Sequence, residues 1–333
     1  MTSNPSLNTS ASLWGGVFFS LAAGMMWGLV FVGPLLLPEY PAALHTFGRY
    51  LAFGLIALPL AYMDRQEIRS LTRADWWTAL KLAAIGNVLY YLFLASAIQR
   101  AGGALPTMII GTLPVVIAVS ANLLSHQRDG RFPWRQLLPP LVLILLGIGC
   151  VNHVEWQALL QRTTTGPASD LSNETSRYIS GAALAVGAVI CWTWYPLKNA
   201  DWLRGHPDRH PRVWATAQGL ATLPLALLGY AAYWLWAHIT HDPMPMPLGP
   251  RPLEFMGLML AIGLLASWLG TLCWNAAAQR LPTALAGQLI VFETLAALGY
   301  AFWLRGHWPE PLTLAGIALL VAGVVGGVRI KAQ

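Results

Sequence analysis

Ten long apolar stretches dominate this sequence, and they restrict the folds open to it more than any other feature. Each is 19 to 25 residues long, and a helix of about 20 mainly apolar residues crosses the hydrocarbon core of a bilayer. Only 10% of the residues are charged, against about 25% in soluble domains, which excludes a water-facing fold of this size. The sequence therefore predicts an all-α integral membrane protein with ten transmembrane helices. The ten stretches are residues 13–36, 42–62, 76–98, 104–125, 134–152, 179–197, 213–237, 254–277, 283–304 and 311–330.

The distribution of Lys and Arg between the loops predicts how these helices are oriented. With the N-terminus inside, the cytoplasmic segments hold 14 of the 20 basic residues and the outer segments hold five. Cytoplasmic loops carry such an excess in membrane proteins. We therefore expect a multi-pass protein of the cell inner (cytoplasmic) membrane with both termini in the cytoplasm, residues 1–12 being a cytoplasmic tail. The same bias accounts for the formal net charge of +6, so no nucleic-acid partner is expected.

The sequence repeats itself with an offset of 180 residues. Residues 97–100 read Ala-Ile-Gln-Arg and residues 277–280 read Ala-Ala-Gln-Arg, and Ala-Leu pairs follow both at the same distance. Two weaker correspondences agree with this repeat: Trp27 with Trp192, and Gly147 with Gly323. We expect one repeat over 13–152, a periplasmic loop over 153–178, and a second repeat over 179–330. Because each repeat holds an odd number of spans, five, the two must be inverted, an architecture common in secondary transporters.

Several segments resemble the drug/metabolite transporter superfamily in its ten-span form, which has two EamA-type halves. The resemblance rests on Trp27 and Gly28 in "AAGMMWGLVFVG", Arg49 in "LHTFGRYLAFGL", Pro114 in "TLPVVIAVSANLL", and the closing segment "LAGIALLVAGVVGG". It covers residues 13–330. The resemblance implies five-helix EamA-type repeats and export of amino acids, other metabolites or drugs; one ten-span branch exports aromatic amino acids. This chain departs from the family at Glu293-Thr294, where Glu-Pro is common.

Two charged residues inside the apolar segments are the first candidates for a transport site. A charge at the centre of a bilayer costs roughly 2.5–3.5 kcal/mol on insertion scales, so such residues are rare unless they have a function. Glu293 lies in the middle of its span, where it could exchange protons, bind a substrate amine, or hydrogen-bond a neighbouring helix. Arg49 could hold a carboxylate in bidentate fashion, reach towards a headgroup, or pair with Glu293.

Further candidates are polar or aromatic residues that helical spacing places on common faces. Asn87 and Tyr91 form one stripe, and Trp268, Thr271 and Asn275 form another on the repeat-related span. Such stripes favour either a cavity with aromatic walls or interhelical hydrogen bonds. The remaining candidates for substrate binding are Trp27, Trp192 and Gln288, and Pro114 is the candidate hinge.

The sequence thus predicts a secondary active transporter that moves small amphipathic metabolites, such as amino acids and especially aromatic ones, by alternating access. Export is the expected direction, and protons are the expected coupling ion. Efflux of lipophilic organic cations is the alternative, with Arg49 then uninvolved. An intramembrane enzyme is a remote third reading, since the sequence has no HExxH, GxSxG or P-loop pattern and we identify no catalytic residue.

The expected partners are a small-molecule substrate, protons and the lipid bilayer, and the expected assembly is a monomer or weak dimer. Cys150, Cys191 and Cys273 lie in apolar segments without metal-ligand or disulfide spacing. We therefore expect neither a cofactor nor a metal site.

Overall fold

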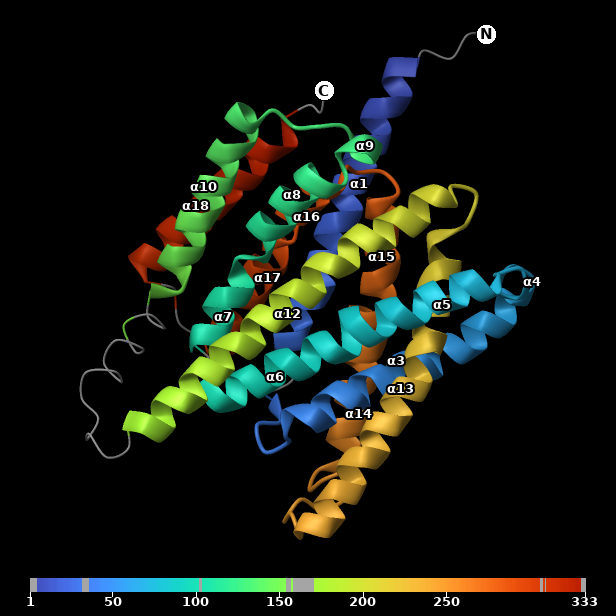
Figure 1. Ribbon diagram of the computed structural model, residues 1–333, viewed down its shortest axis with the longest axis vertical. Coiled ribbons are helices and arrows are strands. Elements are labelled where there is room, and N and C mark those ends of the chain that lie inside the picture. Colours follow the sequence, from blue (N-terminus) through green and yellow to red (C-terminus); the bar gives the residue numbers. More distant parts are fainter. Residues whose placement is uncertain are drawn as a thin grey trace.

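A computed structural model of the chain describes residues 5–31, 36–101, 104–153, 171–305 and 310–330, together with the single residues 157 and 308. Within these residues every regular element is a helix, and the helices pack side by side as one bundle (Figure 1). The predicted all-α class is confirmed for this part of the chain.

Eight helical segments of the described residues are long and apolar enough to cross a membrane, which confirms an integral membrane protein. A ninth apolar helix, α8, is shorter. The eight segments are Ala42–Met63, Arg73–Leu94, Trp134–Val151, Ser176–Gly205, Pro211–Thr240, Pro252–Ala278, Thr283–Tyr300 and Pro311–Val328.

The predicted count of ten spans is not reproduced by length and hydropathy alone. The first predicted span corresponds to α1 (Pro5–Gly28) followed by η1 (Leu29–Phe31). The fourth is divided into α7 (Ala104–Gly111) and α8 (Leu113–Leu124). Ten helical units therefore occupy the predicted places, while the number that cross a bilayer stays a prediction.

The other helices follow the predicted segments closely. Prolines in first turns, where the missing N–H leaves no hydrogen bond unmade, mark the starts of α13, α14 and α18. The α12 helix begins at Leu171, so residues 171–178 of the predicted loop are helical, and most of that loop lies outside the described residues. Their bounds are α3 Ala42–Met63, α4 Arg65–Arg69, α5 Arg73–Lys81, η2 Leu82–Leu89, α6 Tyr90–Ala101, α9 His126–Asp129, α10 Trp134–Val151, α12 Leu171–Gly205, α13 Pro211–Thr240, α14 Pro252–Ile262, η3 Gly263–Leu269, α15 Gly270–Ala278, α16 Thr283–Leu289, α17 Val291–Arg305 and α18 Pro311–Val328.

Two contacts between α10 and α18 are formed by corresponding residues of the two halves of the chain. A Cβ placed on Gly147 would meet Leu320, and a Cβ placed on Gly323 would meet Ile144. Because 144 and 147 correspond to 320 and 323 at one offset, each helix presents the same surface to the other. Such a self-complementary contact is the mark of a two-fold axis, here relating the two repeats within one chain.

A second reciprocal contact lies between α3 and α13, and it exposes a stronger repeat. Residues 54–61 read GLIALPLA and residues 219–226 read GLATLPLA, an offset of 165. Gly54 packs against Leu223 of α13, and Gly219 packs against Phe53 and Ala57 of α3. The offset is the one that relates Trp27 to Trp192, so the first two spans of each half correspond at 165 residues and the third spans at 180.

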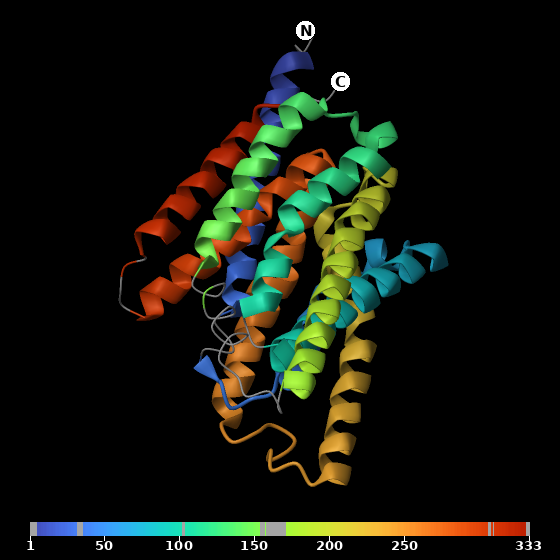
Figure 2. The same ribbon diagram turned by 60° about the vertical axis from the view of Figure 1, so that its left-hand side comes forward.

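The two ends of the bundle differ. The α1 helix begins and α18 ends at one end, whereas residues 36–41 and the segment 241–251 between α13 and α14 lie at the other (Figure 2). Ion pairs tie the elements at the end near the termini: Arg204 of α12 to Asp129 of α9, and Arg212 of α13 to Asp64, the residue that joins α3 to α4.

Candidate functional site

A cavity of about 600 Å³ lies between the two halves, with its mouth at the end formed by residues 36–41 and 241–251. The cavity reaches from that mouth to the middle of the bundle, and its wall is formed by residues of α1, α3, α6, α12, α13, α15 and α17 and of the segments η1, η2 and η3. The lining residues are Trp27, Val30, Pro38, Glu39, Tyr40, Pro41, Ala42, His45, Arg49, Tyr50, Phe53, Asn87, Tyr90, Tyr91, Leu94, Trp192, Tyr195, Tyr233, Asp242, Met244, Ser267, Thr271 and Glu293.

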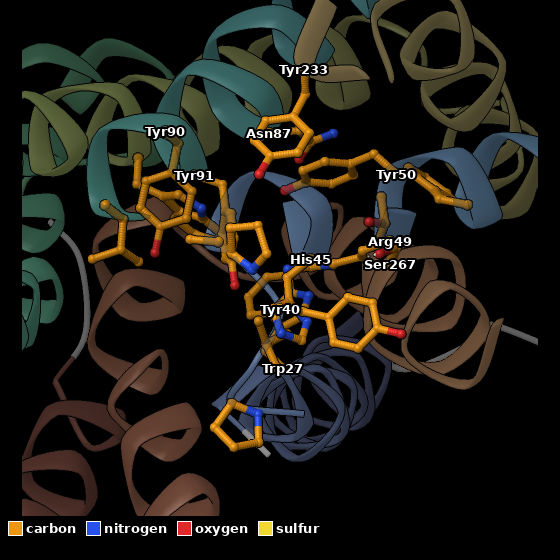
Figure 3. Close-up of a pocket in the computed structure, with 18 of the residues that line it drawn as sticks. Trp27, Tyr40, His45, Arg49, Tyr50, Asn87, Tyr90, Tyr91, Tyr233 and Ser267 are labelled. Atoms are coloured by element: carbon orange, nitrogen blue, oxygen red, sulfur yellow. Dashed lines mark hydrogen bonds between the residues drawn. The ribbon is translucent and has the colours of Figure 1, made fainter. Parts of the chain in front are cut away.

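Arg49 places a guanidinium group in the wall of this cavity. Its Nε donates to the hydroxyl of Ser267 at 2.9 Å, and its Cζ lies 5.0 Å from the ring centroid of Tyr50 and 5.9 Å from that of Tyr91. Figure 3 shows Arg49 beside Ser267 at one side of the cavity. Among the described residues no carboxylate pairs with it, so the two Nη groups, the bidentate fork that matches a carboxylate, have no protein partner.

Glu293 reaches the cavity because the ninth predicted span is interrupted. The α16 helix ends at Leu289 and α17 begins at Val291, which puts Glu293 in the first turn of α17. Carboxylates are favoured there by the helix dipole. Gly24 allows the close approach of α1 and α17, because a Cβ at Gly24 would lie 3.0 Å from the Glu293 backbone nitrogen.

The Glu293 carboxylate has no hydrogen-bond or ion-pair partner within the described part of the chain, although it shares the cavity with Arg49. Glu293 and Arg49 form no direct ion pair in this conformation, and their pairing stays a prediction. An unpaired carboxylate away from bulk water is costly, so this position favours binding of a proton or a cationic group.

Residues that correspond in the two repeats line the same cavity. Tyr91 and Asn87 lie on the wall with Tyr50 and Tyr90, and Trp27 lies at a distance from them (Figure 3). In three pairs of corresponding residues, both members line the cavity: Trp27 with Trp192, Asn87 with Ser267, and Tyr91 with Thr271. The site is thus built around the axis that relates the two halves, where inverted-repeat transporters bind substrate.

Asn87 and Ser267 both belong to short π-helical segments, η2 and η3. A π turn takes in one residue more than an α turn, and such turns occur frequently at functional sites. The two π segments end at corresponding positions of the repeat, Leu89 and Leu269, so both halves interrupt the α-helical hydrogen bonding at the depth of the cavity.

Seven of the predicted substrate or proton residues line the cavity: Trp27, Arg49, Asn87, Tyr91, Trp192, Thr271 and Glu293. Trp268, Asn275 and Gln288 lie outside it. The indole of Trp268 donates to the Thr216 hydroxyl, and Asn275 accepts a hydrogen bond from Asn199. The side chain of Gln288 packs onto Gly327 of α18. The roles predicted for all ten residues remain predictions.

The predicted hinge residue Pro114 lies at the start of α8, two residues after Thr112, which separates α7 from α8. A proline in a first turn has no hydrogen bond to break. The structure therefore places Pro114 beside a break in the fourth span, and its role as a hinge stays a prediction.

Ser267 and most of the tyrosines that line the cavity were not predicted from the sequence. Tyr50, Tyr90 and Tyr195 line the cavity, yet in sequence they look like ordinary aromatic residues of apolar segments. The signal that could have found Ser267 is its correspondence to Asn87 at the 180-residue offset. The signal for Tyr195 is its distance of three residues from Trp192, nearly one helical turn.

The described residues contain no group of three or more His, Cys, Asp or Glu side chains placed to hold a metal ion. The three cysteines are free thiols.

Fold and cavity together define a helical membrane transporter with a central site between two related halves. The comparisons with known proteins agree. Residues 14–168 match the EamA-like transporter family. The chain is 55% identical over 318 residues to the inner membrane protein YtfF of Escherichia coli strain K12, covering 96% of both chains. It belongs to the EamA-like transporter family, within the drug/metabolite transporter superfamily, and is a multi-pass protein of the inner membrane.

A solved crystal structure with 17% sequence identity has the same fold. Its TM-score to this chain is 0.69, and the match covers 94% of this chain and 96% of that one.

Proposed function

We propose that this transporter exports small zwitterionic metabolites with an apolar or aromatic side chain, by alternating access coupled to protons. One observation carries the proposal: a cation and an anion, Arg49 and Glu293, line one cavity and neither is neutralised by the other or by another charged side chain of the described residues. Two such groups fit the carboxylate and the ammonium of one amino-acid-like molecule.

The dimensions and the chemistry of the cavity support a small ligand. Small-molecule sites typically have volumes of about 300–1,000 Å³ and mostly apolar walls with a few placed polar groups. Here the volume is about 600 Å³, and rings of Trp, Tyr and Phe form much of the wall. Tyrosine rings offer apolar faces to a substrate side chain and hydroxyl groups at their edges.

The position of Glu293 also supports coupling to protons. The carboxyl group can hold a proton or a substrate ammonium, and the two exclude each other. A carrier that binds its substrate on one side and exchanges it for a proton on the other would therefore move the two in opposite directions. No ATP-binding pattern occurs in the sequence, so the energy would come from such a gradient.

Efflux of lipophilic organic cations is the second candidate, and one observation favours it. The mouth carries Asp242, and Glu39 paired with Arg251, in addition to Glu293 deeper in the cavity. Arg49 would then serve mainly to hold Ser267 and the rings of Tyr50 and Tyr91 in place.

The test is substrate-induced proton flux in proteoliposomes, recorded against a panel of zwitterionic amino acids and a panel of organic cations. Wild type, Glu293→Gln and Arg49→Ala are compared. We expect a zwitterion signal that both variants lose. The matched controls are Arg65→Ala, which removes an arginine that lies over the ring of Tyr62 outside the cavity, and Glu67→Gln, at an exposed acid.

A cation signal that only Glu293→Gln abolishes would replace the first proposal by the second. A zwitterion flux that Glu293→Gln leaves unchanged in rate and pH dependence would refute a role for Glu293.

A further inference from the structure

A stripe of side chains continues from the floor of the cavity along α12 towards the opposite end of the bundle. Trp192 and Tyr195 line the cavity, and Asn199, Trp202 and His206 follow on the same face at helical spacing. Asn199 is fully buried, and Trp202 is 7% exposed. The stripe therefore leads from the site into a closed region.

This closed region is held by hydrogen bonds that converge on Asn199. Its side-chain oxygen accepts from Nε1 of Trp214 at 2.9 Å and from Nε2 of Gln218 at 3.1 Å. Its amide nitrogen donates to Oδ1 of Asn275 at 2.9 Å. One side chain of α12 thus joins α13 and α15.

The network is connected to the cavity at one side and to the end of the bundle at the other. The hydroxyl of Tyr195, a lining residue, donates to Oε1 of Gln218 at 2.8 Å. The Trp214 ring is stacked on Trp202 with centroids 3.5 Å apart, and Nε1 of Trp202 donates to Asp75 at 2.7 Å.

The internal repeat shows what these residues correspond to in the other half. At the 165-residue offset Trp214 corresponds to Arg49, Gln218 to Phe53, and Tyr195 to Val30. At the 180-residue offset Trp274 corresponds to Leu94. The four counterparts Arg49, Phe53, Val30 and Leu94 all line the open cavity.

The closed region is therefore the symmetry mate of the open path. In an inverted repeat the axis in the membrane plane exchanges the two faces of the bilayer, so an opening towards one face has a counterpart towards the other. In this structure the positions in the first half line the open cavity. The corresponding positions in the second half are filled by the side chains of Trp214, Gln218 and Trp274, which are at most 1% exposed.

We propose that this region is the second gate of the transporter, and that Asn199 is the positioning residue that holds it closed. When the gate opens, Trp214, Gln218 and Trp274 line the path to the other face of the membrane. Nε1 of Trp274 is buried without a hydrogen-bond partner in the described part of the chain, which water or substrate in the opened path would supply. The link from Tyr195 to Gln218 gives the site a direct connection to the gate.

The proposal rests on the chain being an alternating-access carrier, as proposed above, and not on which substrate it carries. Its first test accordingly needs no substrate. Hydrogen–deuterium exchange is measured on the full chain in lipid nanodiscs for peptides covering residues 195–218, in wild type and in Asn199→Leu. Exchange there should become roughly 10- to 20-fold faster, which is the factor that loss of three hydrogen bonds of membrane-protein strength gives.

Asn122→Leu is the matched control. Asn122 is 1% exposed and also makes two hydrogen bonds, both to the backbone of Phe132, but it lies on α8 away from the network. It should leave exchange over 195–218 unchanged. Gln218→Met, which removes the bonds to Tyr195 and Asn199, should give a smaller increase and is informative even where Asn199→Leu does not fold. Equal exchange in wild type, Asn199→Leu and Gln218→Met overturns the proposal.

The second test locks the gate. Cysteines replace Asn199 and Asn275 in a background without Cys150, Cys191 and Cys273, and a short bis-methanethiosulfonate reagent joins them. Relative to the same double-cysteine variant before treatment, the cross-linked carrier should still bind the substrate identified by the flux panel but lose more than 90% of transport, and reduction should return transport to the level before treatment.

Each single-cysteine variant treated with the reagent is the control. Undiminished transport by the cross-linked carrier would show that this region need not open, and would overturn the proposal. A flux panel in which no compound is carried would remove the proposed substrate class, while the exchange measurement would still decide whether Asn199 holds the region closed.

Discussion

The site owes its character to single residues whose charges the fold leaves unneutralised. Arg49 uses its Nε on Ser267 and leaves its two Nη groups without a described partner, and Glu293 leaves both carboxylate oxygens without one. Most ion pairs of the described residues lie instead near the two ends of the helical bundle, as the pair of Arg204 with Asp129 does. This separation of paired from unpaired charges is what distinguishes a binding site from a structural bridge.

Ser267 fixes the direction in which the Arg49 fork points, so Ser267→Ala should weaken the binding of carboxylate substrates. We expect the transport KM to rise about 2- to 10-fold, the effect of one net hydrogen bond, with kcat little changed. Substrate analogues that lack the carboxylate should be unaffected. Ser20→Ala is the control, because the buried hydroxyl of Ser20 has no hydrogen-bond partner within the described residues. An equal KM change for both kinds of substrate would contradict a positioning role.

The charged residues could be found from sequence, whereas most of the cavity wall could not. A charge in an apolar segment is conspicuous, and Arg49 and Glu293 were both identified on that ground. Tyr50 and Tyr90 are not conspicuous, because a tyrosine in such a segment can face the site, a neighbouring helix or the lipid headgroups. Only the rotation of each helix in the bundle decides between these, and it depends on packing between distant segments.

At the scale of the elements, the π segments explain why residues predicted to share one helix face do not all line the cavity. The predicted face of Trp268, Thr271 and Asn275 assumed a continuous α-helix, but η3 extends through Leu269. The π turn changes the angular spacing, so Thr271 lines the cavity while Trp268 contacts Thr216. Local sequence carries no strong signal for a π turn, so the separation of Trp268 from the cavity could not be predicted.

Close glycine contacts hold α10 against α18, and they allow a prediction about stability. A Cβ on Gly147 would lie 2.8 Å from the carbonyl oxygen of Gly316, whereas a Cβ on Gly149 meets nothing within 4 Å. Gly147→Leu should therefore force the helices apart and destabilise the protein by about 1–3 kcal/mol, the usual cost of overpacking. Gly149→Leu, on the same helix, should cost far less.

The measurement is the midpoint of thermal unfolding in detergent, followed by size-exclusion chromatography of heated samples. We expect a clearly lower midpoint for Gly147→Leu than for Gly149→Leu. Midpoints lowered equally would mean that helix propensity and not the α10–α18 contact determines the effect.

At the scale of the whole molecule, the internal repeat was the most productive sequence signal. The 180-residue offset predicted two related halves before any coordinates. The reciprocal contacts of Gly147 with Leu320 and of Gly323 with Ile144, which correspond at an offset of 176, also relate one half to the other. The 165-residue offset between GLIALPLA and GLATLPLA is stronger, but it became plain only once α3 and α13 were seen to pack together. Different offsets for different spans arise because the connecting loops differ in length.

The whole-molecule prediction concerns which face of the membrane the open mouth meets. The excess of Lys and Arg predicts cytoplasmic termini, and the mouth lies at the end away from them (Figure 2). In a cysteine-free background, a cysteine replacing Glu39 at the mouth should react with a membrane-impermeant thiol reagent in spheroplasts. A cysteine replacing the exposed Arg69 should react only in inverted vesicles. The opposite pattern would place the mouth in the cytoplasm, and the structure would then represent the state that takes up substrate for export instead of the state that releases it.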